Sequence, residues 1–234
     1  MKIAVMQPYF MPYIGYFQMI KAVDKFVFYD DVNYIKQGWI NRNKILVNNS
    51  GFLFTVPLKK PTSFSLIKDT LINEKMYDVW KLKFSQTLLQ SYKKAPYFNA
   101  VSKLVEDILE SESITISQLA ITSIMQVTNY LNLNKEFAVS SEVYNNSEMK
   151  RQMRLFDICK KEHATHYINA IGGQELYERE VFLEEKIKLK FIQSKAIPYT
   201  QFKEDFVPGL SIIDVLMFNS VEEVNEMLDQ YQLI

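Results

Sequence analysis

Side chains that suit a charged, polar ligand are concentrated near the start of the chain, within residues 7–44. The segment Lys36–Lys44 alone contains one tryptophan, three amides, one arginine and two lysines. Guanidinium and ammonium groups suit a diphosphate or a carrier phosphopantetheine, and amides offer donors and acceptors to sugar or amide groups. We therefore predict a ligand site here. Its candidate binding residues are Gln7, Tyr9, Tyr13, Gly15, Tyr16, Tyr34, Lys36, Trp39, Asn41, Asn43 and Lys44.

Several members of this set have a second interpretation that the sequence leaves open. Tyr9, Tyr13 and Tyr16 are equally suited to a core or a lid. Trp39 either stacks on a sugar or base or anchors the loop, and Lys44 has the alternative of a solvated face.

Two carboxylates, Asp30 and Asp31, directly follow a predicted strand. Carboxylates in this position bind sugar hydroxyls, hold Mg²⁺ or act as a general base, and the alternative for one of the pair is a cap or turn residue. Arg42 or Tyr13 could donate a hydrogen bond to an oxyanion that develops during a reaction. The predicted catalytic residues are Asp30, Asp31, Arg42 and His166.

Residues later in the chain add to the candidate binding residues and to the candidate catalytic residues. His166 is a competing base, because a neutral imidazole accepts a proton near pH 7, or else a strand histidine with structural partners. Gly172 and Gly173 precede a short predicted helix and form either an anion-binding turn or a plain turn. Asp214 either reaches the site as a late carboxylate or caps the helix that follows it.

A superficial metal pattern also occurs. Cys159, His163 and His166 have the spacing C-x3-H-x2-H, which resembles zinc ligation. No fourth ligand lies nearby in the sequence, so we predict no metal site.

Alternating short strands and helices predict an α/β fold. A strand at 3–6, a helix from about 13 to 23 and a strand at 25–29 form the pattern of a right-handed βαβ unit with parallel strands. We predict further strands at 52–57, 64–67, 135–140, 166–169 and 189–192, and further helices at 77–92, 98–109, 113–131, 149–161, 175–177, around 214 and at 222–230.

The predicted fold class is a mostly parallel, Rossmann-like sheet with helices on both faces and a helical insert at about 74–131. We expect residues 1–234 to form a single domain. Ligands of open parallel sheets bind at the carboxyl ends of the strands. Gln7, Asp30 and Asp31 would lie at that edge.

The charge balance limits the classes of binding partner that we expect. The chain has 234 residues, and its 27 lysines and arginines equal its 27 aspartates and glutamates. Because proteins that coat DNA or anionic membranes usually have a basic excess, we expect no DNA partner. The chain has one cysteine, no signal-peptide pattern and no apolar run of about 20 residues. These features predict a cytoplasmic protein without membrane insertion, and they leave open whether it is a homo-oligomer.

Three blocks of the sequence carry a resemblance to a known family. They are residues 7–17 (QPYFxPYxGYF), residues 29–34 (YDDVxY) with 39–43 (WxNRN), and residues 211–214 (SIID). With these blocks the chain resembles the WbqC-like family of bacterial proteins, which are encoded in polysaccharide and O-antigen gene clusters. The resemblance implies a transferase that attaches glycine or another acyl group to an amino sugar of the O-antigen.

A second likeness concerns the spacing of Tyr13, Gly15 and Tyr16 after the first strand. It resembles the HxGH loop of nucleotidylyltransferases, with tyrosines in place of the two histidines. Tyrosine donates a hydrogen bond but brings no positive charge near neutral pH. The likeness therefore implies a shared fold and nucleotide cleft rather than adenylyl transfer.

The leading functional prediction is acylation of a nucleotide-linked amino sugar. The sequence contains no G-x-S-x-G nucleophile, so we expect direct attack by the sugar amine with Asp30, Asp31 or His166 as the base. The acyl donor would be an acyl carrier protein, a coenzyme A thioester or an aminoacyl donor. The alternatives are a nucleotidylyltransferase-like activating enzyme and a non-catalytic module that binds a sugar nucleotide or a carrier.

Overall fold

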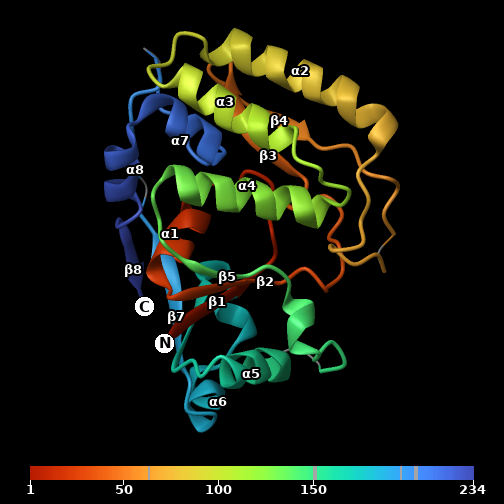
Figure 1. The fold of residues 1–234 in the computed structure, drawn as a ribbon. Helices are drawn as coiled ribbons and strands as arrows, with labels where there is room; N and C mark the ends of the chain where they lie inside the picture. Colours follow the sequence, from red (N-terminus) through yellow and green to blue (C-terminus); the bar gives the residue numbers. More distant parts are fainter. Residues whose placement is uncertain (63, 150–151, 196, 203–204) are drawn as a thin grey trace.

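The computed structural model describes residues 1–62, 64–149, 152–195, 197–202 and 205–234, and its centre is a six-stranded sheet (Figure 1). The strand order is β5-β2-β1-β6-β7-β8. The bounds are β1 (Lys2–Met6), β2 (Lys25–Phe28), β5 (Glu136–Ala138), β6 (His166–Ala170), β7 (Lys188–Ser194) and β8 (Tyr231–Leu233). All neighbours pair in parallel except β7 and β8. The prediction of a mostly parallel α/β sheet is confirmed.

The order of the strands defines a switch point between β1 and β6. The chain proceeds from β1 outward to β2 and β5, then returns to the other side of β1 with β6 and continues to β7. The loops that follow β1 and β6 diverge there, which is where open α/β sheets bind ligands.

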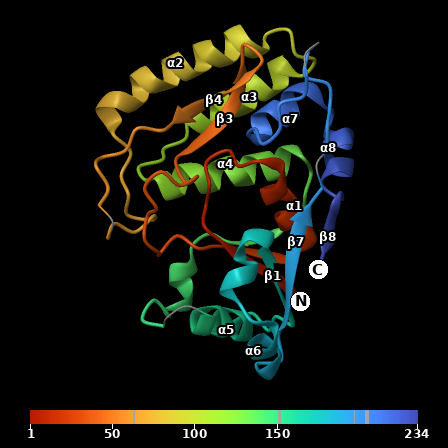
Figure 2. The same ribbon diagram turned by 180° about the vertical axis from the view of Figure 1, so that it is seen from behind.

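Helices cover both faces of the sheet because its strands alternate apolar side chains between the faces. Ile3 and Val5 of β1 pack with α5 (Gln152–Lys161) and α6 (Arg179–Glu184). Ala4 belongs to the opposite core, and α1 (Ile14–Ala22) packs there on β1, β6 and β7. Figures 1 and 2 show α1 above the sheet and α5 and α6 below it.

The helical insert consists of α2 (Glu74–Tyr92), α3 (Phe98–Leu109) and α4 (Ile116–Tyr130). These helices lie above the sheet, with α4 nearest to it (Figure 1). The start of α4 is set by a capping box, in which Thr115 and Gln118 each bond the other's backbone amide. The last helices are α7 (Ile212–Phe218) and α8 (Val221–Met227).

Three expectations about strands need correction. The predicted strand at 64–67 is wrong: Phe64 and Ile67 lie in turns, and Leu66 forms only an isolated bridge with Asn33. The predicted loop around Lys44 instead begins a hairpin of β3 (Arg42–Val47) and β4 (Ser50–Thr55). Strand β8 was not predicted, because Tyr231–Leu233 continues a helical stretch without a turn signal.

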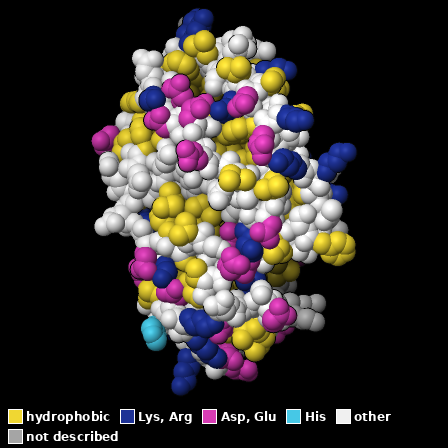
Figure 3. Space-filling view, turned by 45° about the vertical axis from the view of Figure 1, so that its right-hand side comes forward, with side chains coloured by type: hydrophobic (Ala, Val, Ile, Leu, Met, Phe, Trp, Pro, Cys, Tyr) yellow, Lys and Arg dark blue, Asp and Glu magenta, His cyan; other side chains and the backbone are white. Residues whose placement is uncertain are grey.

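Acidic and basic side chains are interspersed on the face shown in Figure 3. Among the described residues, no helix has the length and apolarity needed to cross a membrane. The same part of the chain contains no group of three or more His, Cys, Asp or Glu side chains placed to hold a metal ion.

Candidate functional site

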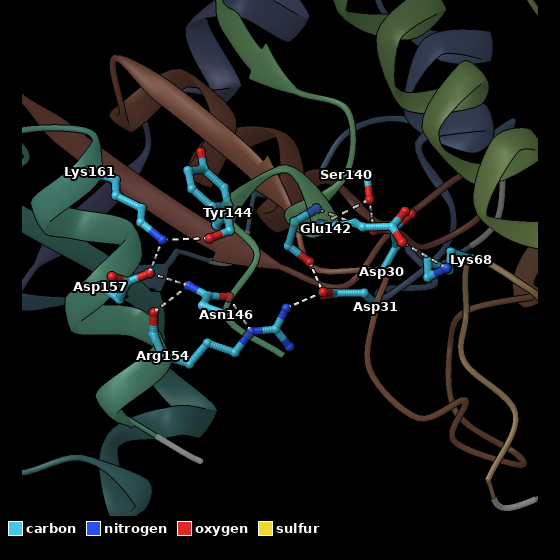
Figure 4. A network of polar contacts seen from close by, with 11 residues as sticks. Asp30, Asp31, Lys68, Ser140, Glu142, Tyr144, Asn146, Arg154, Asp157 and Lys161 are labelled. Atoms are coloured by element: carbon cyan, nitrogen blue, oxygen red, sulfur yellow. Dashed lines mark hydrogen bonds and ion pairs between the residues drawn. The ribbon is translucent and has the colours of Figure 1, made fainter. Parts of the chain in front are cut away.

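Asp30 lies where three elements meet at the carboxyl edge of the sheet. It follows β2, and its carboxylate accepts hydrogen bonds from Ser117 Oγ at the start of α4 (2.8 Å) and from Ser140 Oγ after β5 (2.6 Å). The backbone amide of Ser141 adds a third at 3.3 Å. Figure 4 shows this carboxylate within a larger polar network.

Asp30 is chemically distinct from a surface aspartate. The residue is only 3% exposed, and burial raises the pKa of its carboxyl above the ordinary value, against the opposing effect of its serine and amide donors. A carboxylate with a raised pKa is a stronger proton acceptor. Asp30 therefore suits the role of general base.

Asp30 borders a hollow of about 450 Å³, here called the Asp30 hollow. Its lining is rich in hydroxyls and includes one ammonium group. The lining residues are Asp30, Lys68, Asp69, Thr115, Ser117, Gln118, Ile121, Thr122, Met125, Val139, Ser140 and Glu142. This volume lies within the range of about 300–1,000 Å³ for small-molecule sites.

Lys68 is the cation of this hollow and was not predicted. Its Nζ lies 3.2 Å from Asp69 and 3.3 Å from Glu142. The hydrogen bond to Asp69 raises the pKa of Lys68, so it is charged at neutral pH. Nothing in the local sequence distinguishes Lys68. Ser140 was detectable, since it ends a predicted strand of the parallel sheet.

Asp31 faces away from the hollow and holds α5 to the sheet. Its carboxylate pairs with the Arg154 guanidinium and accepts a hydrogen bond from Ser141 Oγ. Arg154 also lies over the ring of Tyr29, 4.7 Å from its centroid, and donates to Asn146 Oδ1 at 2.8 Å. Figure 4 shows the pair between the Asp30 site and α5. The position of Asp31 supports a structural role.

A second, smaller hollow brings together other predicted residues. It measures about 210 Å³ and is here called the aromatic hollow. Four of the predicted binding residues line it, together with a proline and a late glycine. The lining residues are Tyr9, Pro12, Tyr13, Trp39, Asn43 and Gly209.

Most polar residues of the segment 34–44 are engaged within the protein. Asn41 is buried, accepts from Tyr34 Oη (2.8 Å) and donates to the carbonyl of Val56 (2.9 Å). Asn43 donates to the carbonyl of Met11 at 2.7 Å. Both amides therefore fix the loops around them.

Arg42 and the two lysines keep their charge at the surface. Arg42 Nε donates to the carbonyl of Gly38 at 2.9 Å, a second nitrogen donates to the carbonyl of Gln37, and its guanidinium lies 5.8 Å from the Trp39 ring. Lys36 and Lys44 are exposed. Arg42 does not line the Asp30 hollow, so its predicted partnership with Asp30 lacks structural support.

The two predicted tyrosines that follow β1, Tyr13 and Tyr16, have different surroundings. Tyr16 is buried and its hydroxyl donates to the carbonyl of Gln7 at 2.9 Å, which leaves Tyr13 as the exposed tyrosine of the pair. A Cβ on Gly15 would lie 2.4 Å from Tyr13 Cε2 and 2.7 Å from Ser194 Oγ. A methyl group here would require the Tyr13 ring and the Ser194 hydroxyl to shift.

His166 lies at the opposite edge of the sheet. It begins β6, next to Lys2 of β1 and Lys188 of β7. Burial, followed by the positive charge of Lys188 and of the amino terminus, lowers the pKa of its imidazole. The length of β6 separates His166 from Gly172 and Gly173, which follow that strand at the carboxyl edge. The structure therefore does not bring His166 together with Asp30.

Asp214 is an interior carboxylate, fully buried within the α7 region. It accepts hydrogen bonds from Tyr92 Oη (2.7 Å), Tyr199 Oη (2.5 Å) and Gln201 Nε2 (2.6 Å). The cap of α7 is Ser211, whose Oγ accepts from the amide of Ile213. Asp214 thus takes neither of its predicted positions and connects α2, α7 and the segment before it.

A further hollow of about 780 Å³ is lined by residues of α5 and of the segment 175–181. None of the predicted site residues borders it.

The strand order, the switch point and the polar hollow at the carboxyl edge define a doubly wound α/β protein with a candidate small-molecule site. The model of the WbqC-like protein family matches residues 7–226, and the chain belongs to this family. The chain is 29% identical over 230 residues to an uncharacterized protein of Mycobacterium tuberculosis, covering 97% of both chains. No solved structure matches it.

Proposed function

We propose that this protein is an acyltransferase of polysaccharide biosynthesis that acts on a nucleotide-linked amino sugar. The observation that carries the proposal is Asp30, a buried carboxylate with a raised pKa beside a hydroxyl-lined hollow of about 450 Å³. Hydroxyl and amide side chains suit a sugar, and a basic carboxylate suits removal of a proton from an attacking amine.

Lys68 takes the part that the sequence suggested for Arg42. Its ammonium borders the same hollow as Asp30, so it is placed to offset negative charge on a reacting oxygen. A lysine held near two carboxylates stays charged, which a stabiliser of an oxyanion requires.

The proposed step is direct acyl transfer. The sugar amine nitrogen attacks the donor carbonyl carbon, a C–N bond forms, and Asp30 accepts a proton from the nitrogen. The oxyanion of the tetrahedral intermediate faces Lys68. When the intermediate collapses with a thioester donor, the C–S bond breaks, and the leaving thiolate receives the proton from Asp30.

The test is formation of an amide product, measured by mass spectrometry. UDP- and dTDP-linked amino sugars would be combined with acetyl-coenzyme A, an acyl carrier thioester or an aminoacyl donor. Asp30→Asn should reduce the rate at least a hundredfold. The matched control, Asp229→Asn, changes an exposed carboxylate paired with Lys21 and should keep full activity. Full activity of Asp30→Asn would refute the assignment.

A binding module without catalysis is the second candidate, and the aromatic hollow favours it. Three aromatic side chains line this hollow, and none of the predicted bases is among its lining residues. This alternative requires saturable binding of a sugar nucleotide with no product from any donor, and an Asp30→Asn variant that alters affinity alone. The nucleotidylyltransferase alternative has less support, because Tyr16 is buried and bonded to Gln7.

A further inference from the structure

The aromatic hollow has the dimensions of a subsite for one planar ring. Its volume of about 210 Å³ is below the range typical of complete small-molecule ligands, yet Tyr9, Tyr13 and Trp39 all border it. Tyr13 is 43% exposed and Trp39 is 44% exposed, unusual values for large aromatic residues within one hollow. The side chains of Tyr13 and Trp39 are therefore accessible to a ligand from solvent.

The polar tips of these rings are available. In the described part of the chain, no hydrogen bond engages the hydroxyls of Tyr9 and Tyr13 or the indole nitrogen of Trp39. Burial raises the pKa of both tyrosines, so their hydroxyls stay protonated at neutral pH. The hollow thus combines stacking surfaces with donors for the edge of a ring.

The walls of the hollow are held in place without a ligand. The ring of Tyr9 packs on Tyr16 with centroids 5.7 Å apart, and the backbone of Tyr13 pairs with Ser211. The side chain of Asn43 holds the carbonyl of Met11. Gly209, with φ of +70°, has no atom within 4 Å of its absent Cβ position, so this wall stays open.

A cation lies beside one wall of the hollow: Arg42 is not a lining residue, but its guanidinium approaches Trp39, which is. Arg42 lies 5.8 Å from the Trp39 ring and uses two N–H groups on the carbonyls of Gln37 and Gly38. A guanidinium has five N–H groups, so three remain for an anion. Arginine held in this way is suited to a phosphate.

We propose that the aromatic hollow binds a nucleotide, with the base against Tyr13 and Trp39 and the phosphate at Arg42. The ligand class follows from the juxtaposition of ring faces, edge donors and a fixed guanidinium. The inference rests on the proposed function, because the nucleotide would be the carrier half of the amino-sugar substrate.

Trp39 provides the readout. The chain has two tryptophans, and Trp80 stacks on Phe84 with centroids 5.1 Å apart. In a Trp80→Phe background the fluorescence reports Trp39 alone. Titration with UDP, dTDP and ADP should give saturable quenching by at least one of them. Uridine, thymidine or adenosine should bind about tenfold more weakly than its diphosphate, and ribose 5-phosphate should not quench.

Variants in the same background locate the ligand. Tyr13→Ala should weaken nucleotide binding at least tenfold, because stacking on an aromatic ring contributes strongly to base binding. Arg42→Gln should abolish the preference for nucleotide over nucleoside. The control Phe64→Ala removes an aromatic ring that is 84% exposed outside the hollow and should change nothing.

Absence of saturable quenching by all three diphosphates at millimolar concentration would overturn the inference, as would unchanged affinity in Tyr13→Ala. Asp30→Asn separates the two proposals, since it should bind nucleotide normally while losing acyl transfer. Nucleotide binding that needs Tyr13, without product from any donor, would leave this site standing and refute acyl transfer. If Tyr13→Ala kept both acyl transfer and normal nucleotide affinity, the nucleotide site would be refuted and the acyltransferase proposal would stand.

Discussion

Arg154 and Asp31 are 123 positions apart in the sequence and form an ion pair whose side chains are 4% and 5% exposed. The pair joins α5 to the end of β2, directly beside Asp30. Through Ser141, which contacts both aspartates, it also fixes the segment that follows β5. Asp31 therefore supports the position of the carboxylate that borders the hollow.

Breaking this pair should destabilise the protein strongly. Arg154→Met leaves Asp31 buried without its cation, and we expect a loss of about 3–5 kcal/mol in the free energy of unfolding, measured in urea. Lys103→Met, which removes exposed ion pairs on α3, should leave the free energy of unfolding nearly unchanged. Adding Asp31→Asn to Arg154→Met should restore part of the loss. Equal effects of Arg154→Met and Lys103→Met would contradict the structural role.

The raised pKa of Asp30 predicts a specific pH dependence. Because burial disfavours the ionised carboxyl, the folded-state pKa lies above the unfolded value, and the stability linked to Asp30 is fully present below the unfolded pKa. It is lost as the pH rises through the folded-state pKa. Asp30→Asn lacks this titration. Its free energy of unfolding should therefore rise relative to the native protein across that window, and parallel pH curves would contradict the shift.

The buried network of Asp214 should contribute to stability rather than to chemistry. Tyr92 Oη donates to Asp214 and accepts from the backbone amide of Leu46 at 2.6 Å. Tyr92→Phe leaves both groups without this partner and should lower the free energy of unfolding by about 1–3 kcal/mol. Tyr130→Phe, at a partly exposed tyrosine outside this network, is the control and should change it by less than about 0.5 kcal/mol.

Two glycines give a matched steric test by calorimetric melting. Gly15→Ala places a Cβ within 2.4 Å of Tyr13 and 2.7 Å of Ser194, so the Tyr13 ring must move. We expect this displacement to lower the melting midpoint. Gly172→Ala meets no atom within 4 Å and should leave the midpoint nearly unchanged. Similar melting midpoints in the two variants would show that the Tyr13 ring moves aside without loss of stability.

Helices and strands were predicted correctly where the local apolar spacing was regular. The helix at 98–109 was predicted with its observed bounds, because its apolar spacing is regular and Ala95-Pro96 interrupts the preceding helix. The parallel strands were predicted from short apolar runs flanked by polar residues. Strand β3 was not predicted, because Arg42, Asn43 and Lys44 resemble a loop, although the strand pairs fully with β4.

The sequence by itself determined the family, the α/β class and the stretch of chain in which polar and aromatic side chains would gather. The sequence motifs and the apolar spacing are local features, so they can be recognised without knowing which elements pack against each other. Only the tertiary structure decided which of two adjacent aspartates borders a hollow, because that depends on Ser117, Ser140 and Arg154 from distant elements. It also divided the predicted residues between the Asp30 hollow and the aromatic hollow and placed His166 at the far edge, since strand direction and helix packing are set by contacts across the whole chain.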